Sequence, residues 1–207
     1  MGVIAFTITL VIITVLLSVA AFNDSRMADK LILWPARMHK AREYYRLLTS
    51  GFIHADWMHL IFNMLALFSF GRLVEALFMY RGITPWLYMF MYLSGIVVSS
   101  LPSFYKHREN PYYRSLGASG GVASVLFASV YFAPWQWMNI MFIPMPNIVF
   151  AVLYLVYSAY MSKRGGGTIN HDAHFWGAVW GFVFTLTVDP SHGGIFLDQI
   201  RDFSFPR

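Results

Sequence analysis

Six long apolar segments constrain this chain more than any other feature of its sequence. A helix needs about 20 mainly apolar residues to cross a bilayer. The chain has runs close to that length at residues 3–22, 57–79, 84–103, 116–133, 146–162 and 171–188, bounded by charges, prolines or glycines. Only 12% of its residues are charged, roughly half the share found in soluble domains. No strand-like alternation indicates a barrel, so the sequence predicts an all-α membrane protein built as a six-transmembrane-helix bundle.

The predicted bundle is expected to form a single domain over residues 1–207, because no linker or low-complexity segment divides the chain. The first apolar run lacks a charged region before it and is long for a signal peptide, so it is expected to remain as a helix. Residues 23–56 mix apolar, aromatic and basic side chains. That mixture favours a segment lying among lipid headgroups, with a solvated connector as the alternative.

Composition also excludes several classes of site. Cysteine is absent, so a disulfide framework, a thiolate metal site and a cysteine nucleophile are excluded. The seven histidines do not form the His-Glu-x-x-His pattern of a zinc hydrolase, and neither a metal nor another cofactor is expected. The net charge of +5 comes from loops between apolar runs, where basic residues act as membrane anchors. A lipid bilayer is therefore the expected partner, and nucleic acid is not.

Polar side chains lie near the start of alternate spans. His59 and Asn63 are near the start of the second span, Ser119 near the start of the fourth, and His174 near the start of the sixth. Since successive spans alternate in direction, these starts emerge on one side of the membrane. Polar groups within spans usually face the interior or a wet cavity. The four side chains are therefore expected to meet at one depth.

Small residues predict how the fourth and sixth spans approach each other. The sixth span carries a ridge of small residues spaced four apart, namely Ala173, Gly177 and Gly181. Such ridges allow neighbouring helices to pack closely. Packing this ridge against Gly120 and Ala123 would bring the imidazole of His174 within reach of the Ser119 hydroxyl.

The sequence also predicts what the remaining faces of these two spans contact. Trp176 and Trp180 point away from the ridge on the sixth span and are expected to face lipid. The fourth span has a second row of small residues that should pack against another helix, which the pattern does not identify: Gly117, Gly121, Ser124 and Ala128.

A serine hydroxyl beside a neutral histidine suggests nucleophilic hydrolysis. Histidine can take the hydroxyl proton near neutral pH, and the developing oxyanion could be stabilised by the Ser119 backbone N–H, the His59 ring and the Asn63 amide. Asp172 lies on a different helical face from His174, so no acidic residue is well placed as a third member. The residues predict a Ser–His dyad.

Each of these residues also has a structural alternative. Small residues in membrane helices usually mean close packing, and His59 with Asn63 could be a capped helix start or an interhelical hydrogen-bond pair. His54 and His171 are expected to be structural or interfacial. A transporter using His59, His171 and His174 as a relay is a further alternative, disfavoured by a lack of carboxylates within the spans and of repeat symmetry.

Four sequence pieces together resemble the rhomboid family of intramembrane serine proteases: Tyr45-Arg46, His54-Ala-Asp-Trp-Met-His59-Leu-Ile-Phe-Asn63, Gly117-Ala-Ser119-Gly120 and Ala173-His174-Phe-Trp-Gly177-Ala-Val-Trp-Gly181. The match covers nearly the whole chain and corresponds to the minimal six-helix form. The resemblance implies Ser119 as nucleophile and His174 as base, with an oxyanion and substrate-stabilising set of His59, Asn63 and Gly117. It also implies cleavage of client proteins in or next to a transmembrane helix, without a cofactor. The alternative function is that of a catalytically inactive relative that binds and escorts membrane proteins.

The resemblance further implies a multi-pass protein of the plasma or inner membrane with its active site near the outer face. Substrates of such families often enter past the fifth helix, here 146–162, and the loop at 163–170. Family members often carry an aromatic residue four positions after the serine, where this chain has Ala123, so another group must hold His174. Eleven of the fifteen Lys and Arg residues fall in loops that the family topology places outside. The positive-inside rule alone would invert the protein, and we retain the family orientation because residues 23–56 are expected to fold into the interface.

Overall fold

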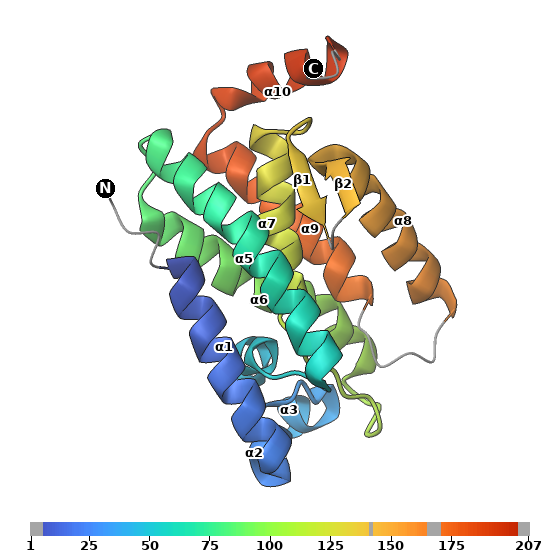
Figure 1. The fold of residues 1–207 in the computed structure, drawn as a ribbon. Coiled ribbons are helices and arrows are strands. Elements are labelled where there is room, and N and C mark those ends of the chain that lie inside the picture. Colours follow the sequence, from blue (N-terminus) through green and yellow to red (C-terminus); the bar gives the residue numbers. More distant parts are fainter. Residues whose placement is uncertain (1–5, 141–142, 165–170, 203–207) are drawn as a thin grey trace.

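The long helices of the bundle coincide with the predicted spans. The computed structural model describes residues 6–140, 143–164 and 171–202, and the predicted start of the first span at residue 3 lies outside them. The long helices are α1 (Phe6–Asn23), α5 (Trp57–Tyr80), α6 (Pro85–His107), α7 (Ser119–Phe132), α8 (Asn147–Arg164) and α9 (His171–Val188) (Figure 1). The prediction of an all-α membrane bundle is confirmed.

Shorter elements fill the connections. Between α1 and α5 lie α2 (Ser25–Leu31), α3 (Pro35–Ala41), α4 (Arg46–Thr49) and the 3-10 helix η1 (Ser50–Phe52). Two features were not predicted from the sequence. One is the antiparallel hairpin of β1 (Trp137–Ile140) and β2 (Ile143–Pro146), and the other is α10 (His192–Arg201), which follows α9. The prolines of β2 are tolerated because a two-stranded hairpin consists of edge strands.

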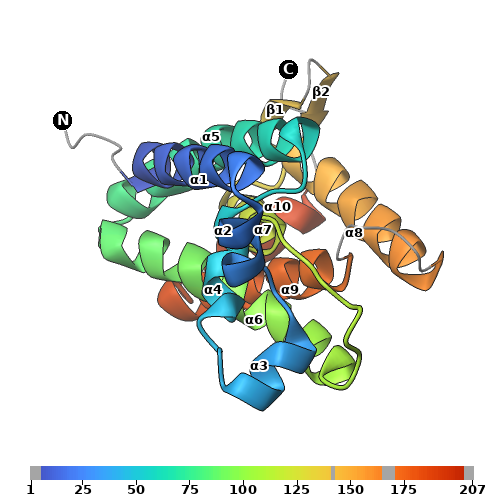
Figure 2. The same cartoon turned by 90° about the horizontal axis from the view of Figure 1, so that it is seen from below.

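Helix α7 is the central helix of the bundle and is short. It has 14 residues and rises about 21 Å, less than the roughly 30 Å of a hydrocarbon core. Nearly its whole length is buried, and Figure 2 shows it surrounded by α5, α6 and α9, with α8 at the edge of the bundle. Among the described residues, the helices long and apolar enough to cross a membrane by themselves are α1, α5 and α6. The segment predicted as the fourth span is therefore an enclosed helix with at least one end recessed from the bilayer surface.

Helices α7 and α9 touch through their backbones. A Cβ on Gly177 would overlap the Gly120 carbonyl, and one on Gly181 would overlap the Ser124 backbone. The order of these two contacts shows that the helices run parallel. The Ser124 hydroxyl lies 3.0 Å from the Gly120 carbonyl oxygen and 2.9 Å from that of Gly177, so it bridges both helices. The predicted ridge is confirmed for Gly177 and Gly181, but Ser124 takes the place expected for Ala123.

The second row of small residues on α7 packs against α6. A Cβ on Gly121 would lie 2.9 Å from side-chain carbons of Tyr92 and of Ile96. On the other side of this contact, a Cβ on Gly95 would lie 3.0 Å from the Ser124 Cβ. The helix that the sequence pattern left open is therefore α6.

One tryptophan was placed wrongly by the helical phase of the sixth span. Trp176 is exposed, as expected for a lipid-facing residue. Trp180 is half-buried instead, and its indole N–H donates to the Ser94 hydroxyl of α6 at 3.0 Å. The two tryptophans differ because α6 covers the α9 face next to Gly181, and buried indoles need an acceptor.

The bundle contains a buried carboxylate that the sequence reasoning overlooked. Glu75 of α5 accepts hydrogen bonds from the Phe6 N–H at 2.9 Å, the Thr7 N–H at 3.0 Å and the Thr7 hydroxyl at 2.7 Å. It therefore caps the first turn of α1, where a helix leaves N–H groups without intrahelical partners. Glu75 lies 16 residues beyond His59, about 24 Å along α5. The statement that the spans lack carboxylates was wrong, and this carboxylate joins α1 to α5 far from the candidate site.

Residues 23–56 form a packed layer around one buried guanidinium. Arg46 is fully buried. Its Nε lies 2.6 Å from the Glu43 carboxylate, and its Nη1 donates to the carbonyl oxygens of Asp29 and Ile32 at 2.6 Å and 3.0 Å. A buried arginine needs such partners for its several donors. These contacts tie the end of α2 to the start of α4, and the placement of this segment among lipid headgroups stays a prediction.

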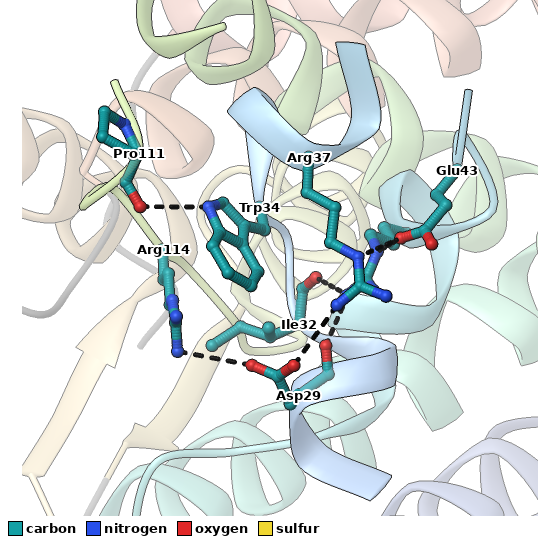
Figure 3. A network of polar contacts seen from close by, with 8 residues as sticks. Asp29, Ile32, Trp34, Arg37, Glu43, Pro111 and Arg114 are labelled. Atoms are coloured by element: carbon teal, nitrogen blue, oxygen red, sulfur yellow. Dashed lines mark hydrogen bonds and ion pairs between the residues drawn. The ribbon is translucent and has the colours of Figure 1, made fainter. Parts of the chain in front are cut away.

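This layer also holds the loop that precedes α7 (Figure 3). The guanidiniums of Arg37 and Arg114 lie 5.7 Å and 4.0 Å from the centroid of the Trp34 ring. The Trp34 indole donates to the Pro111 carbonyl at 3.1 Å, and Arg114 pairs with Asp29 at 3.3 Å. The first loop therefore anchors the segment that ends at Ser119.

The helix contact at Gly181 predicts a specific destabilisation. In Gly181→Ala the new methyl group meets backbone atoms of Ser124, which cannot rotate away. We expect the free energy of unfolding to fall by roughly 1–3 kcal/mol, as in other overpacked interiors. Titration of the protein with a denaturing detergent, followed by circular dichroism, measures this change.

Gly194→Ala is the matched control, because a Cβ at Gly194 of α10 meets nothing within 4 Å. This variant should be as stable as the original protein or slightly more so, since alanine is the better helix former. Equal stability of Gly181→Ala and Gly194→Ala would contradict the close backbone contact.

Candidate active site

The backbone that precedes Ser119 is held by the first loop. Ser115 and Leu33 form a β-bridge with N···O distances of 3.0 Å and 3.1 Å. The Gly117 N–H then donates to the Ser50 carbonyl at 2.9 Å, and Ser119 is the first residue of α7. The candidate nucleophile therefore lies at a helix N-terminus whose approach is fixed from outside the helix.

Gly117 brings His59 against this loop. Its φ of +121° is one that residues with a side chain rarely adopt. A Cβ at this position would lie 2.6 Å from His59 Cε1 and 2.8 Å from its Nε2. The His59 ring thus lies against the backbone two residues before Ser119, and both backbone conformation and space require glycine there.

His54 is a structural residue. The Ala118 N–H donates to His54 Nε2 at 3.3 Å, so Nε2 carries no proton. The proton on Nδ1 is therefore donated to the Ser18 hydroxyl at 2.9 Å, and that hydroxyl donates to the Phe52 carbonyl at 3.1 Å. Of the two alternatives that the sequence left for His54, structural or interfacial, these contacts support the structural one.

His54 also contacts the candidate oxyanion group. Its ring meets the His59 ring edge to face, with centroids 4.9 Å apart. Asn63, one turn further along α5, is buried and donates its amide to the His59 carbonyl at 2.9 Å. An amide carries two N–H groups, so one remains to serve a substrate oxygen. The roles assigned to His59 and Asn63 stay predictions.

His174 is held by an aromatic ring from α8. The imidazole stacks on the Tyr154 ring, with centroids 5.2 Å apart and planes inclined by 24°. An aromatic ring therefore does lie on His174, but it comes from α8 and not from the helix that carries Ala123. The sequence reasoning missed Tyr154 because periodicity shows which face of a helix is apolar but not which ring on it meets a residue of another helix.

A small polar cavity adjoins the candidate nucleophile. It is lined by Ser119, Gly117 and Gly120 together with Ala173 of α9 and the α6 serines Ser99 and Ser100. Its volume is ≈ 10 Å³, about the space for one water molecule. Ser99 and Ser100 donate to the Ile96 carbonyl at 3.0 Å and 2.8 Å, which leaves their oxygens able to accept from a water.

The candidate residues come from elements that meet around the start of α7. Ser119 and Gly117 share a cavity with Ala173, the residue next to His174. His174 lies one turn before Gly177, on the α9 face that touches Gly120. Asp172 forms an ion pair with Lys106 of α6 at 3.5 Å. That pairing is consistent with a dyad rather than a triad.

The chain also matches a known family. Residues 41–190 match the family model of the Rhomboid domain, a range that contains every candidate site residue. The chain belongs to the rhomboid family. The match covers the helices from α4 to α9 and the loop before Ser119.

Three relatives show how far the likeness extends. The chain is 32% identical over 155 residues to Rhomboid-like protein 11, chloroplastic, of Arabidopsis thaliana, covering 70% of this chain and 52% of that protein. It is 30% identical over 155 residues to Rhomboid protease GluP of Bacillus subtilis, covering 74% and 28%. It is 30% identical over 144 residues to the human presenilin-associated rhomboid-like protein, mitochondrial, covering 67% and 36%. This rhomboid spans about half or less of the length of these relatives.

The buried position of His54 predicts how this rhomboid responds to acid. Burial lowers the pKa of the His54 imidazole below its usual range. The ring is therefore neutral in the folded protein, whereas in the unfolded chain it takes up a proton below about pH 6.5. Since the unfolded state binds more protons, the free energy of unfolding should fall from pH 7 to pH 5, by at most about 1.4 kcal/mol per pH unit for one proton.

Unfolding titrations in denaturing detergent at several pH values measure this loss. His54→Gln keeps an acceptor for the Ala118 N–H but does not titrate, so its free energy of unfolding should decline less towards pH 5. His39→Gln, on the exposed face of α3, should retain the decline of the original protein. An identical pH dependence in His54→Gln and the original protein would contradict the structural role.

Proposed function

We propose that this rhomboid is an intramembrane serine endopeptidase that cleaves peptide bonds in or next to transmembrane helices of client proteins. Its catalytic residues are Ser119 and His174. The observation that carries the proposal is the parallel contact of Gly120 with Gly177. This contact sets the start of α7 beside the α9 face to which His174 belongs.

The proposed reaction begins with proton transfer from the Ser119 hydroxyl to the His174 imidazole. The serine oxygen then attacks the substrate carbonyl carbon and forms a tetrahedral intermediate. His174 returns the proton to the leaving amine, which leaves an acyl group on Ser119. A water molecule, activated by the same imidazole, attacks this ester, and expulsion of the serine oxygen with uptake of the proton restores both residues.

The oxyanion of each intermediate is stabilised at the N-terminus of α7. The first N–H groups of a helix lack partners within the helix and point along a dipole that favours negative charge. The Ser119 N–H belongs to this set, and the His59 ring and the second amide N–H of Asn63 add donors from α5. The role of Gly117 is to let the His59 ring approach the oxyanion position.

The substrate is expected to be a transmembrane helix that unwinds locally. A peptide bond within an intact helix has its carbonyl hydrogen-bonded and shielded from attack, so small or helix-breaking residues near the cleavage site favour cleavage. Water for the second half of the reaction is held in the cavity lined by Ser99 and Ser100. Substrates are proposed to approach from the bilayer past α8, which lies at the edge of the bundle (Figure 2).

The protein is a multi-pass membrane protein, and we place it in the plasma or inner membrane with Ser119 near the outer face. The distribution of Lys and Arg opposes this orientation, since the positive-inside rule counts basic residues and gives acidic ones little weight. Among the basic residues of the outer loops, Arg37 and Arg46 pair with Glu43, Arg114 pairs with Asp29, and Lys106 pairs with Asp172. These ion pairs show that the basic residues have structural partners within the folded loops, and the proposed orientation rests on the family resemblance.

Replacing the nucleophile tests the proposal. The purified protein in lipid vesicles should cleave a model transmembrane substrate and react with a serine-directed fluorophosphonate, and Ser119→Ala should lose both activities. Cleavage is measured by electrophoresis and labelling by fluorescence of the protein band. Cleavage that persists in Ser119→Ala would rule out the dyad.

The control variant is Ser129→Ala on the same helix. The Ser129 hydroxyl is buried and donates to the Leu126 carbonyl of its own turn, so its removal should leave cleavage and labelling unchanged. If the original protein neither cleaves nor labels while remaining folded, the alternative of an inactive escort protein replaces the proposal.

A further inference from the structure

The stack between Tyr154 and His174 assigns a role to a residue outside the Ser–His dyad. We propose that Tyr154 of α8 is the positioning residue for His174, holding the imidazole in the orientation needed to accept the Ser119 proton. This inference rests on the proposed function for its catalytic consequence. The ring contact itself does not depend on that function.

A dyad needs an external group to fix the orientation of its base. In a triad, a carboxylate hydrogen-bonded to the imidazole fixes both the ring and its tautomer. Here the acidic residue nearest in sequence, Asp172, pairs with Lys106 of α6. The methyl group of Ala123 offers no flat surface for the imidazole. An aromatic face stacked on the ring restricts its rotation instead.

The geometry of the stack is that of an attractive aromatic pair. Centroids 5.2 Å apart with planes inclined by 24° fall within the range of offset-stacked rings. The contact joins helices that are consecutive in sequence, α8 and α9, which also pack against each other elsewhere. The Tyr154 ring is half-buried, so it presents one surface to the imidazole and is not free in solvent or lipid.

Tyr154 is itself held by a row of rings. Phe150, one turn earlier on α8, lies 6.1 Å from Tyr154 between centroids and stacks on Phe70 of α5 at 5.9 Å and 13°. The row from Phe70 through Phe150 and Tyr154 to His174 therefore connects α5 to α9 across α8. The orientation of the base consequently depends on how α8 is seated against the bundle.

The outward face of α8 makes this dependence important. Val152, Leu153 and Val156 are all exposed, so within residues 147–156 this side of the helix makes few contacts with the rest of the protein. A displacement of α8 would separate Tyr154 from His174 and remove the stacking contact on the imidazole. The stacked orientation of the base therefore requires α8 to be packed in place.

The proposal distinguishes the ring of Tyr154 from its hydroxyl group. Tyr154→Phe keeps the stack, so its kcat and its rate of fluorophosphonate labelling should equal those of the original protein. Tyr154→Leu keeps apolar bulk without an aromatic face. Its kcat and labelling rate should fall roughly two- to tenfold, the range that the strength of aromatic pairs implies, while KM changes little.

Leu153→Ala is the control on α8. This variant shortens an apolar side chain next to Tyr154 in the sequence. Because Leu153 is exposed, kcat and the labelling rate should be unchanged. A Tyr154→Leu variant with the original kcat and labelling rate would overturn the proposal. A Tyr154→Phe variant as impaired as Tyr154→Leu would also overturn it, since the hydroxyl would then be the functional group.

Nuclear magnetic resonance separates this inference from the proposed function. In protein labelled at histidine, the His174 Cε1–H signal is assigned by its loss in His174→Gln. Stacking predicts an upfield ring-current shift of that signal that remains in Tyr154→Phe and disappears in Tyr154→Leu. If the protein is not a protease, this chemical shift still tests the ring contact. An unchanged His174 signal in Tyr154→Leu would overturn the proposed stack.

Discussion

Backbone contact between α7 and α9 is the constraint on which the candidate site depends. Helices in a bilayer gain little from burying apolar side chains against each other, since lipid is equally apolar, so they associate through close packing and hydrogen bonds. Gly177 and Gly181 allow α9 to touch the α7 backbone, and the Ser124 hydroxyl joins the carbonyls of Gly120 and Gly177. The depth and the face of His174 relative to Ser119 follow from this register.

The serine side of the site is fixed by the first loop instead. Buried Arg46 organises that loop through Glu43 and backbone carbonyls, and the loop then holds the backbone before Ser119 through Ser50 and His54. The proposed hydrolysis needs a preorganised N-terminus on the short central helix, and the packed layer of residues 23–56 supplies that rigidity. The position of Ser119 is therefore fixed by two separate features, the glycine contact between α7 and α9 and the folded first loop.

Much of the helical bundle could be predicted from the sequence, because a bilayer restricts the structures that a chain can adopt within it. Apolar runs predicted the six long helices to within four residues at each described end, and the four-residue spacing identified Gly177 and Gly181 as contact positions. Contacts between helices were harder to predict, since helical phase shows which residues share a face but not which helix packs against that face. Helical phase predicted that Trp180 faces lipid, although α6 covers it. It also predicted Ala123 at the contact with α9, where Ser124 packs instead. It gave no indication that Tyr154 contacts His174. Glu75 was overlooked because its donors belong to α1, 68 and 69 residues away in sequence.

Cross-linking between α7 and α9 tests the central claim most directly. Because the sequence contains no cysteine, only the introduced thiols can react. Ser119→Cys and His174→Cys should be introduced together, and the protein treated in membranes with a short bifunctional thiol reagent. The glycine contact predicts rapid intramolecular cross-linking of this pair. It predicts none for Ser119→Cys combined with Val183→Cys, because Val183 lies on the exposed face of α9. Failure of the first pair to cross-link while both thiols react singly would contradict the account.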